Sequence, residues 1–369
     1  MSTSRFLRFS FATTCFWLLV IGGTISSHAQ TRAYTVDFDG AINVFDTETN
    51  AVVDKITLCT NLSCTPIIAA ATPNGTRLYV TNTLLNNVWV VDTISDTVID
   101  TITVGPNPWG VAITPDGKRA YVAAGGIIDV IDTDTNRVIH TISDIDNPIG
   151  IAITPDGTRA YVANGAGTVS VVDTGTDTII ATIPILDRFG LPAFGLSAIV
   201  ITPDGTRAYV VSSNTGQIDV IDTTTNAVIT TIPPQMDYPL GGGNLSLALN
   251  SDGTRVYTAS PFLPAVVIDT SSNTIIATIP INGSMPFVGV TPDDTKLYVN
   301  AGGAVSIFDT STLALITSIQ LSRFSGGITF ATLPERPHSK DDCNDGGFQR
   351  FSALAFRNQG QCIKFFNEH

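Results

Sequence analysis

Hydrophobic and polar positions alternate along the chain in short runs, and patterns long enough for a long helix are missing. In the segment 151–183, β-branched and aromatic residues gather in four runs that are separated by turns rich in Pro, Asp, Gly and Thr. Runs of this length and composition are typical of β-strands. We therefore expect strands at 151–154, 159–163, 169–173 and 178–183, with Pro155-Asp156-Gly157 forming the first turn.

This four-strand unit is repeated along the chain. The phrase TPDGTRAYV begins at Thr154 and again at Thr202, and related phrases begin at Thr72, Thr114, Asn250 and Thr291. A second phrase, such as VVDT or VIDT, occurs seven times, with its aspartate at Asp46, Asp92, Asp132, Asp173, Asp222, Asp269 and Asp309. The intervals of 40 to 49 residues match the period of a propeller blade, which is one four-stranded sheet.

The two ends of the repeat array complement each other. The first copy begins at Arg32 with its second strand, and one extra first-strand phrase, Gly327 to Phe330, follows the seventh copy. Pairing these two segments would close a ring and remove an open sheet edge. We predict an all-β fold over residues 30–333, a seven-bladed β-propeller of four-stranded antiparallel blades, in which a C-terminal strand completes the first blade.

The two recurring phrases resemble the YVTN family of β-propeller repeats, which is found in secreted and surface-layer-type proteins. The resemblance extends from about Thr31 to Leu333, and both phrases recur in order. It implies the seven-bladed fold, but it implies little about activity.

The first 29 residues have the pattern of a signal peptide. Arg5 and Arg8 precede a mostly apolar stretch from Phe9 to Ile25, and Ser27 and Ala29 are small residues suited to a cleavage site. The alternative is an uncleaved membrane anchor, but Ser and Thr residues interrupt the apolar stretch. We expect cleavage near Ala29, a secreted or extracytoplasmic protein (periplasm or cell surface), and no transmembrane segment after cleavage.

The charge of the chain argues against several kinds of partner. The full sequence has a formal net charge of −13, and without Arg5 and Arg8 it holds 17 basic and 32 acidic residues. An acidic chain without a basic stripe repels phosphate groups. We therefore expect no nucleic acid as a partner, and anionic lipid is a poor candidate.

Four cysteines remain once Cys15 is removed with the signal peptide. They form two local pairs, Cys59 with Cys64 and Cys343 with Cys362, which we predict to be disulfides in an exported protein. Metal ligation is the alternative, but the pairs lack CxxC spacing and a histidine cluster. The second pair lies in residues 334–369, which we interpret as a linker followed by a small disulfide-stapled motif. That motif resembles a short cysteine-paired element at the ends of secreted bacterial proteins.

Residues that recur once per blade are expected to be structural. The aspartates of the second phrase should accept hydrogen bonds from the following turn. A tyrosine of the second strand should pack between blades in each copy: Tyr34, Tyr79, Tyr121, Tyr161, Tyr209, Tyr257 and Tyr298. A basic residue of the same strand should pair with carboxylates: Arg32, Arg77, Arg119, Arg159, Arg207, Arg255 and Lys296.

Departures from the repeat are the places to look for a site. Two connections between blades are lengthened, 184–197 and 233–246, and in propellers such connections surround one mouth of the central channel. Loops on a rigid scaffold often carry binding residues. We predict a ligand-binding rim formed by Trp109, Asp187, Arg188, Phe189, Phe194, Met236, Tyr238, Phe262 and Phe287. Asp187 and Arg188 would add polar specificity. The alternative is that the apolar side chains fold back and plug the channel or cover the loops.

No catalytic constellation is visible in the sequence. The three histidines that follow the expected signal peptide, His140, His338 and His369, do not form a metal set, and neither a CxxCH haem motif nor a GxSxG elbow is present. We therefore assign no catalytic residue, no metal and no cofactor. The favoured hypothesis is a non-enzymatic binding scaffold for a protein, peptide or glycan of the cell envelope. The alternative is a propeller enzyme, a lactonase-like hydrolase or a cofactor-dependent oxidoreductase, with its site at the central channel.

Overall fold

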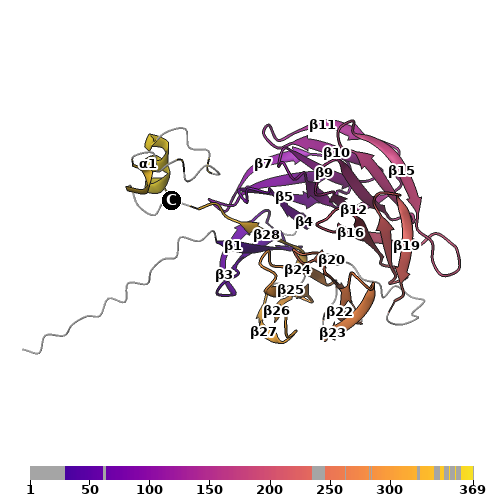
Figure 1. Cartoon of the computed structure of the whole chain (residues 1–369). Coiled ribbons are helices and arrows are strands. Elements are labelled where there is room, and N and C mark those ends of the chain that lie inside the picture. The colour runs from indigo at the N-terminus through magenta and orange to yellow at the C-terminus, as the bar shows by residue number, and fades with distance from the viewer. Residues whose placement is uncertain are drawn as a thin grey trace, which may run out of the picture.

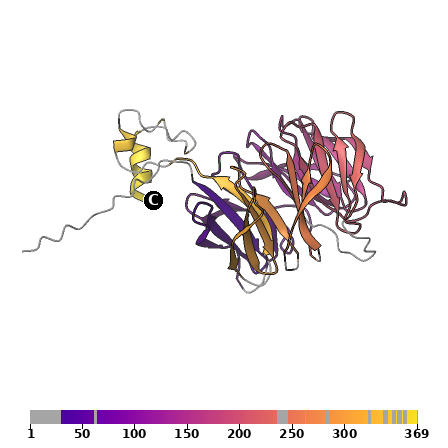
Figure 2. The same ribbon diagram turned by 60° about the horizontal axis from the view of Figure 1, so that its bottom comes forward.

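The computed structural model describes residues 30–60, 64–234, 246–261, 263–281, 283, 285–321 and 325–335, and parts of 341–368. The expected signal peptide, residues 1–29, lies outside the described residues. The strands form a ring of twisted sheets, and a short helical segment near the C-terminus lies outside that ring (Figures 1 and 2).

The ring consists of seven antiparallel four-stranded sheets, which we number as blades in chain order. Blade 1 contains β28 (Ser325–Thr332), β1 (Thr31–Asp37), β2 (Ala41–Asp46) and β3 (Ala51–Thr57). Blade 2 contains β4 (Pro66–Ala71), β5 (Arg77–Asn82), β6 (Asn87–Asp92) and β7 (Thr97–Thr103). Blade 3 contains β8 (Val111–Ile113), β9 (Arg119–Ala124), β10 (Ile127–Asp132) and β11 (Arg137–Ile142). Blade 4 contains β12 (Pro148–Ile153), β13 (Arg159–Asn164), β14 (Thr168–Asp173) and β15 (Thr178–Pro184).

The remaining three blades repeat this order. Blade 5 contains β16 (Leu196–Ile201), β17 (Arg207–Ser212), β18 (Ile218–Asp222) and β19 (Ala227–Ile232). Blade 6 contains β20 (Ser246–Leu249), β21 (Arg255–Ser260), β22 (Leu263–Asp269) and β23 (Thr274–Ile279). Blade 7 contains β24 (Phe287–Val290), β25 (Lys296–Ala301), β26 (Ala304–Asp309) and β27 (Leu315–Gln320). The predicted fold class, a seven-bladed propeller, is confirmed.

The closing strand lies where the ends of the repeat array predicted it. β28 pairs antiparallel with β1, with Phe330 opposite Ala33 and Ile328 opposite Thr35. The first and last parts of the propeller thus share one sheet, and β28 covers the edge of β1 that would otherwise be unpaired. This pairing confirms the predicted closure.

The hydrophobic core lies between blades rather than within one central mass. Each of seven clusters joins apolar side chains from two neighbouring blades. All seven second-strand tyrosines are buried in these layers, as predicted. At the junction of blades 7 and 1, the Tyr298 ring meets the rings of Phe45 and Phe330 edge to face, with centroids 6.2 and 5.4 Å away.

The prediction for the basic residues is mostly wrong. Of these seven residues, Arg32 forms an ion pair with Asp96 and Arg119 forms one with Asp177. Arg159 instead donates to the main-chain carbonyl of Thr223 at 2.8 Å, in the next blade, and Arg77, Arg207 and Arg255 make the same kind of bond. A guanidinium at this position joins blades through backbone oxygens, which every turn supplies whatever its sequence.

The aspartates of the second phrase behave as predicted. Asp173, for example, accepts hydrogen bonds from the backbone N–H of Thr176 at 2.9 Å and from the Thr176 hydroxyl at 3.0 Å. These bonds lower the pKa of the Asp173 carboxyl. The carboxylate therefore fixes the turn that leads to the outer strand.

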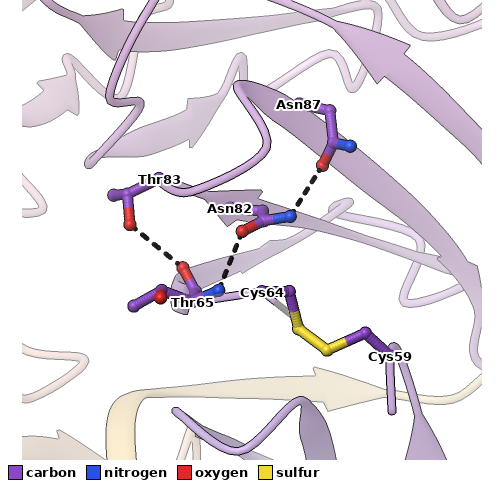
Figure 3. The surroundings of a disulfide bond; sticks show 6 residues. All are labelled: Cys59, Cys64, Thr65, Asn82, Thr83 and Asn87. Atoms are coloured by element: carbon purple, nitrogen blue, oxygen red, sulfur yellow. Dashed lines mark hydrogen bonds between the residues drawn. A yellow bond between two sulfur atoms is a disulfide. The ribbon is translucent and has the colours of Figure 1, made fainter. Parts of the chain in front are cut away.

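Both predicted disulfides are present. Cys59–Cys64 joins the end of blade 1 to the start of blade 2. Next to it, the backbone N–H of Thr65 donates to Oδ1 of Asn82 at 2.9 Å, and the Thr83 hydroxyl donates to the Thr65 carbonyl at 3.2 Å (Figure 3). Cys343–Cys362 joins the 3₁₀ turn η1 (Asp341–Cys343) to helix α1 (Gln359–Glu368). In the part of the chain that the structure describes, no helix has the length and apolar character needed to cross a membrane.

Candidate functional site

The connection between blades 4 and 5 forms a small hairpin, residues 185–195, that extends past the rim of the ring (Figure 1). Leu186 and Pro192 form an isolated antiparallel bridge, and the backbone N–H of Asp187 donates to the Leu191 carbonyl at 2.7 Å. Four large apolar side chains on this hairpin are exposed: Leu186 (49%), Phe189 (72%), Leu191 (60%) and Phe194 (54%). An exposed apolar group of this kind often marks an interaction site.

The base of the hairpin is held firmly by both neighbouring blades. The backbone N–H of Ile185 donates to the Gly167 carbonyl at 2.9 Å, and that of Gly195 donates to the Gly165 carbonyl at 2.7 Å, both in blade 4. In blade 5, the Ser212 hydroxyl donates to the Phe194 carbonyl at 2.8 Å. The side chains of Ile185 and Ala193 are fully buried. The apolar tip therefore sits on a fixed base, which limits the entropy lost on binding.

The tip of the hairpin is shaped by Asp187. Its Oδ1 accepts hydrogen bonds from the backbone N–H groups of Phe189 at 2.8 Å and Leu191 at 2.9 Å. The Arg188 guanidinium lies over the Phe189 ring, 4.8 Å from its centroid. The structure thus brings together three predicted rim residues, Asp187, Arg188 and Phe189, in one turn.

A cavity of about 520 Å³ lies between this hairpin and blade 5. The hairpin side is formed by residues 186–189, and the blade side by Asn214, Thr215, Gln217 and Thr231, with Pro233 and Pro234 beside them. Volumes of about 300–1,000 Å³ are usual for small-ligand sites. The lining combines an aromatic ring with amides and hydroxyls, so it can offer both an apolar contact and directed hydrogen bonds.

A buried polar network supports the floor of the cavity. Gln217, only 4% exposed, donates from Nε2 to the Leu186 carbonyl at 2.9 Å and to Oδ2 of Asp219 at 2.7 Å. Asp219 also accepts a bond from the Thr231 hydroxyl. Burial raises the pKa of the Asp219 carboxyl, and the bonds from Thr231 and Gln217 act in the opposite direction. This network fixes the Gln217 amide plane between the hairpin and blade 5.

Of the other predicted rim residues, the three that the structure describes, Trp109, Phe194 and Phe287, do not line this cavity. Trp109 lies in the connection between blades 2 and 3, and its side chain is 39% exposed. Its backbone N–H donates to the Ala123 carbonyl at 2.9 Å. Phe194 is exposed at the base of the hairpin, outside the cavity lining. Met236, Tyr238 and Phe262 lie outside the described residues.

Phe287 lies in the wall of the central channel rather than in an exposed loop. Phe287 lies in β24 and is 9% exposed. It lines a space of about 180 Å³ at the channel, which residues in or next to the first strands of all seven blades surround. The described residues that line this space are glycine, alanine, serine, aliphatic residues and Phe287 itself, with no carboxylate, imidazole, thiol or amine among them.

Several lining residues were not predicted from the sequence. Asn214, Thr215 and Gln217 lie in the connection between the second and third strands of blade 5, residues 213–217, which carries no recognisable motif but is longer than the corresponding connection of every other blade. Gln217 lies next to the start of the third strand, at a position that other residues occupy in the other copies. Its role depends on the hairpin, because its side chain donates a hydrogen bond to the Leu186 carbonyl. Among the described residues, no group of three or more His, Cys, Asp or Glu side chains is placed to hold a metal ion.

The comparisons with known proteins agree with the fold and leave the function open. No protein-family model and no curated protein matches the sequence. Among solved structures, the chain is similar to Kuenenia stuttgartiensis hydrazine synthase, with a TM-score of 0.61 and 22% identity. The match covers 69% of this chain and 86% of that chain. At this identity the likeness supports the propeller fold alone.

Proposed function

We propose that this protein is an extracytoplasmic β-propeller of the YVTN-repeat type that acts as a non-enzymatic binding scaffold. Its binding site is the 185–195 hairpin with the adjoining cavity. The observation that carries the proposal is the combination of four exposed apolar side chains with a base hydrogen-bonded to two blades. A soluble protein seldom keeps such a group uncovered unless it is covered on binding.

The proposed location rests on the two disulfides and on the N-terminal sequence. Disulfides persist in oxidising compartments and are rare in the cytosol. The acidic composition also suits a neutral or cationic partner better than an anionic one. The partner would be a protein, peptide or glycan of the cell envelope.

Immobilised mature protein, incubated with cell-envelope and culture-fluid fractions, tests the scaffold proposal. The Phe189→Ser/Leu191→Ser variant removes two tip side chains, and Ile139→Ser/Ile180→Ser removes two exposed apolar side chains on outer strands, as a control. We expect the hairpin variant alone to lose the retained component, with thermal unfolding unchanged in both variants. Equal retention by the wild type and the hairpin variant would contradict the proposal.

A further inference from the structure

We infer that the cavity beneath the hairpin binds a neutral sugar unit of a glycan; this inference rests on the scaffold function proposed above. The first step is the chemistry of the lining. The described residues on the blade side of the cavity supply uncharged polar groups, the amides and hydroxyls of Asn214, Thr215, Gln217 and Thr231. Such groups can pair with sugar hydroxyls, which both donate and accept hydrogen bonds.

The second step is the buried amide of Gln217. Its Nε2 is used twice, by the Leu186 carbonyl and by Asp219, so its orientation is fixed. Among the described residues, no side-chain bond to Oε1 accompanies these two. An amide oxygen held in this way at a cavity floor favours a ligand that carries a hydrogen-bond donor, such as a hydroxyl.

The third step is the aromatic ring at the cavity edge. Phe189 is 72% exposed, and the guanidinium of Arg188 lies over its ring. An aromatic ring can cover the C–H face of a sugar while the hydroxyls remain at the sugar's edge, where they meet polar groups. The pairing of one aromatic wall with neutral polar groups therefore fits a sugar ring better than a wholly apolar side chain.

The fourth step is charge. Among the described residues, the cavity lining contains one acidic residue, Asp187, and one basic residue, Arg188, so this part of the site has no charge excess. The whole chain is acidic, and it repels polyanions at long range. The ligand is therefore a neutral glycan rather than a phosphorylated or carboxylated one.

A glycan array tests the inference. It carries neutral oligosaccharides (short β-1,4-linked N-acetylglucosamine, glucose, mannose and galactose oligomers) together with sialylated and phosphorylated counterparts. Each sugar that binds is then titrated by calorimetry. Phe189→Ser removes the aromatic wall and Gln217→Met removes the fixed amide. Ile139→Ser is the control, because it removes an exposed apolar side chain of an outer strand, outside both the hairpin and the lining.

We expect at least one neutral sugar to bind, with affinity reduced about tenfold in Phe189→Ser and Gln217→Met, and unchanged in Ile139→Ser. Binding of anionic sugars alone, binding of no sugar, or an equal loss in Ile139→Ser would overturn the inference. If no sugar binds but the envelope fractions still contain a component retained through the hairpin, the scaffold function stands and only the ligand class is wrong.

Discussion

The hydroxyl of Tyr161 in blade 4 donates a 2.6 Å hydrogen bond to Oδ1 of Asn226 in blade 5. Asn226 has a positive φ of 53°, a conformation that asparagine tolerates better than most residues. One residue thus shapes the turn of its own blade and accepts a bond from the neighbouring blade. Tyr79 with Asn136, Tyr121 with Asp177 and Tyr209 with Asn273 repeat this arrangement.

Substitution of Asn226 can separate these two roles. Asn226→Gly keeps the positive φ but loses the acceptor, and we expect it to lower the free energy of unfolding by about 1 kcal/mol. Asn226→Ala loses both, with an expected cost of about 2 kcal/mol. Denaturant unfolding measures each value. In a Tyr161→Phe background the cost of Asn226→Gly should shrink, and an unchanged cost would show that the hydrogen bond contributes nothing.

Blade 7 departs from this rule, and the departure allows a stabilising substitution. Leu313 occupies the equivalent turn position with a φ of 58°, which is strained for a leucine. Arg255 reaches only the main-chain carbonyl of Thr310 in this turn, at 3.1 Å. We expect Leu313→Asn to raise the free energy of unfolding by about 1 kcal/mol, because it relieves the strain and places an acceptor near Tyr257.

Leu313→Gly is the control for that gain in stability, since it relieves the strain of the positive φ without supplying a hydrogen-bond acceptor. It should stabilise less than Leu313→Asn, because Leu313 also packs partly against the core cluster around Tyr257. A loss of stability in Leu313→Asn would mean that this packing outweighs the strain. Thermal unfolding at neutral pH distinguishes the cases.

The fold could be predicted from the sequence because the strand and turn patterns that determine it are local and recur in each copy of the repeat. The predicted strands at 159–163 and 178–183 correspond to β13 (Arg159–Asn164) and β15 (Thr178–Pro184), and β28 pairs as the missing strand required. The prediction of carboxylate partners for the arginines was mostly wrong, because most of these arginines bind backbone carbonyls of the next blade. Every residue has such a carbonyl, so the sequence does not indicate which one will be the partner.

The site was only partly predictable for a similar reason. The length of the 184–197 connection pointed to the hairpin, and Asp187, Arg188 and Phe189 do meet there. Gln217 could not be chosen beforehand, because its role depends on a carbonyl 31 residues away in sequence. Phe287 resembled a loop aromatic, but its strand places it in the channel wall.

Close packing around the channel predicts a strong effect for a very small substitution. A Cβ added to Gly150 would lie 2.8 Å from the Ser197 carbonyl oxygen and 3.0 Å from Cα of Ala198, in the neighbouring first strand. Backbone atoms cannot move aside as a side-chain end can, so we expect Gly150→Ala to cost about 2–3 kcal/mol of unfolding free energy. Chemical denaturation provides the measurement.

Gly175→Ala is the matched control for that substitution. A Cβ there would meet only the Asp173 carboxylate oxygen at 3.3 Å, in an exposed turn. We expect an effect within about 0.5 kcal/mol. Equal costs for the two variants would show that the first strands of blades 4 and 5 separate more easily than their spacing indicates.

The buried tyrosines predict how stability responds to alkaline pH. Burial raises the pKa of six second-strand phenols: Tyr79, Tyr121, Tyr161, Tyr209, Tyr257 and Tyr298. In the unfolded chain these phenols titrate near pH 10. Since the folded pKa values are raised, their contribution to stability is complete below about pH 10 and is lost as the pH rises further.

We therefore expect the phenolate absorbance of these six residues to appear together with the loss of β-structure, above about pH 10. Near-ultraviolet absorbance and circular dichroism, recorded on the same samples across the alkaline range, measure the two events. Tyr238→Phe serves as a control, because it removes the one tyrosine outside the repeat. Reversible ionisation of all six residues near pH 10 with unchanged circular dichroism would mean that the blades open locally, and that the tyrosine layer does not hold neighbouring blades together.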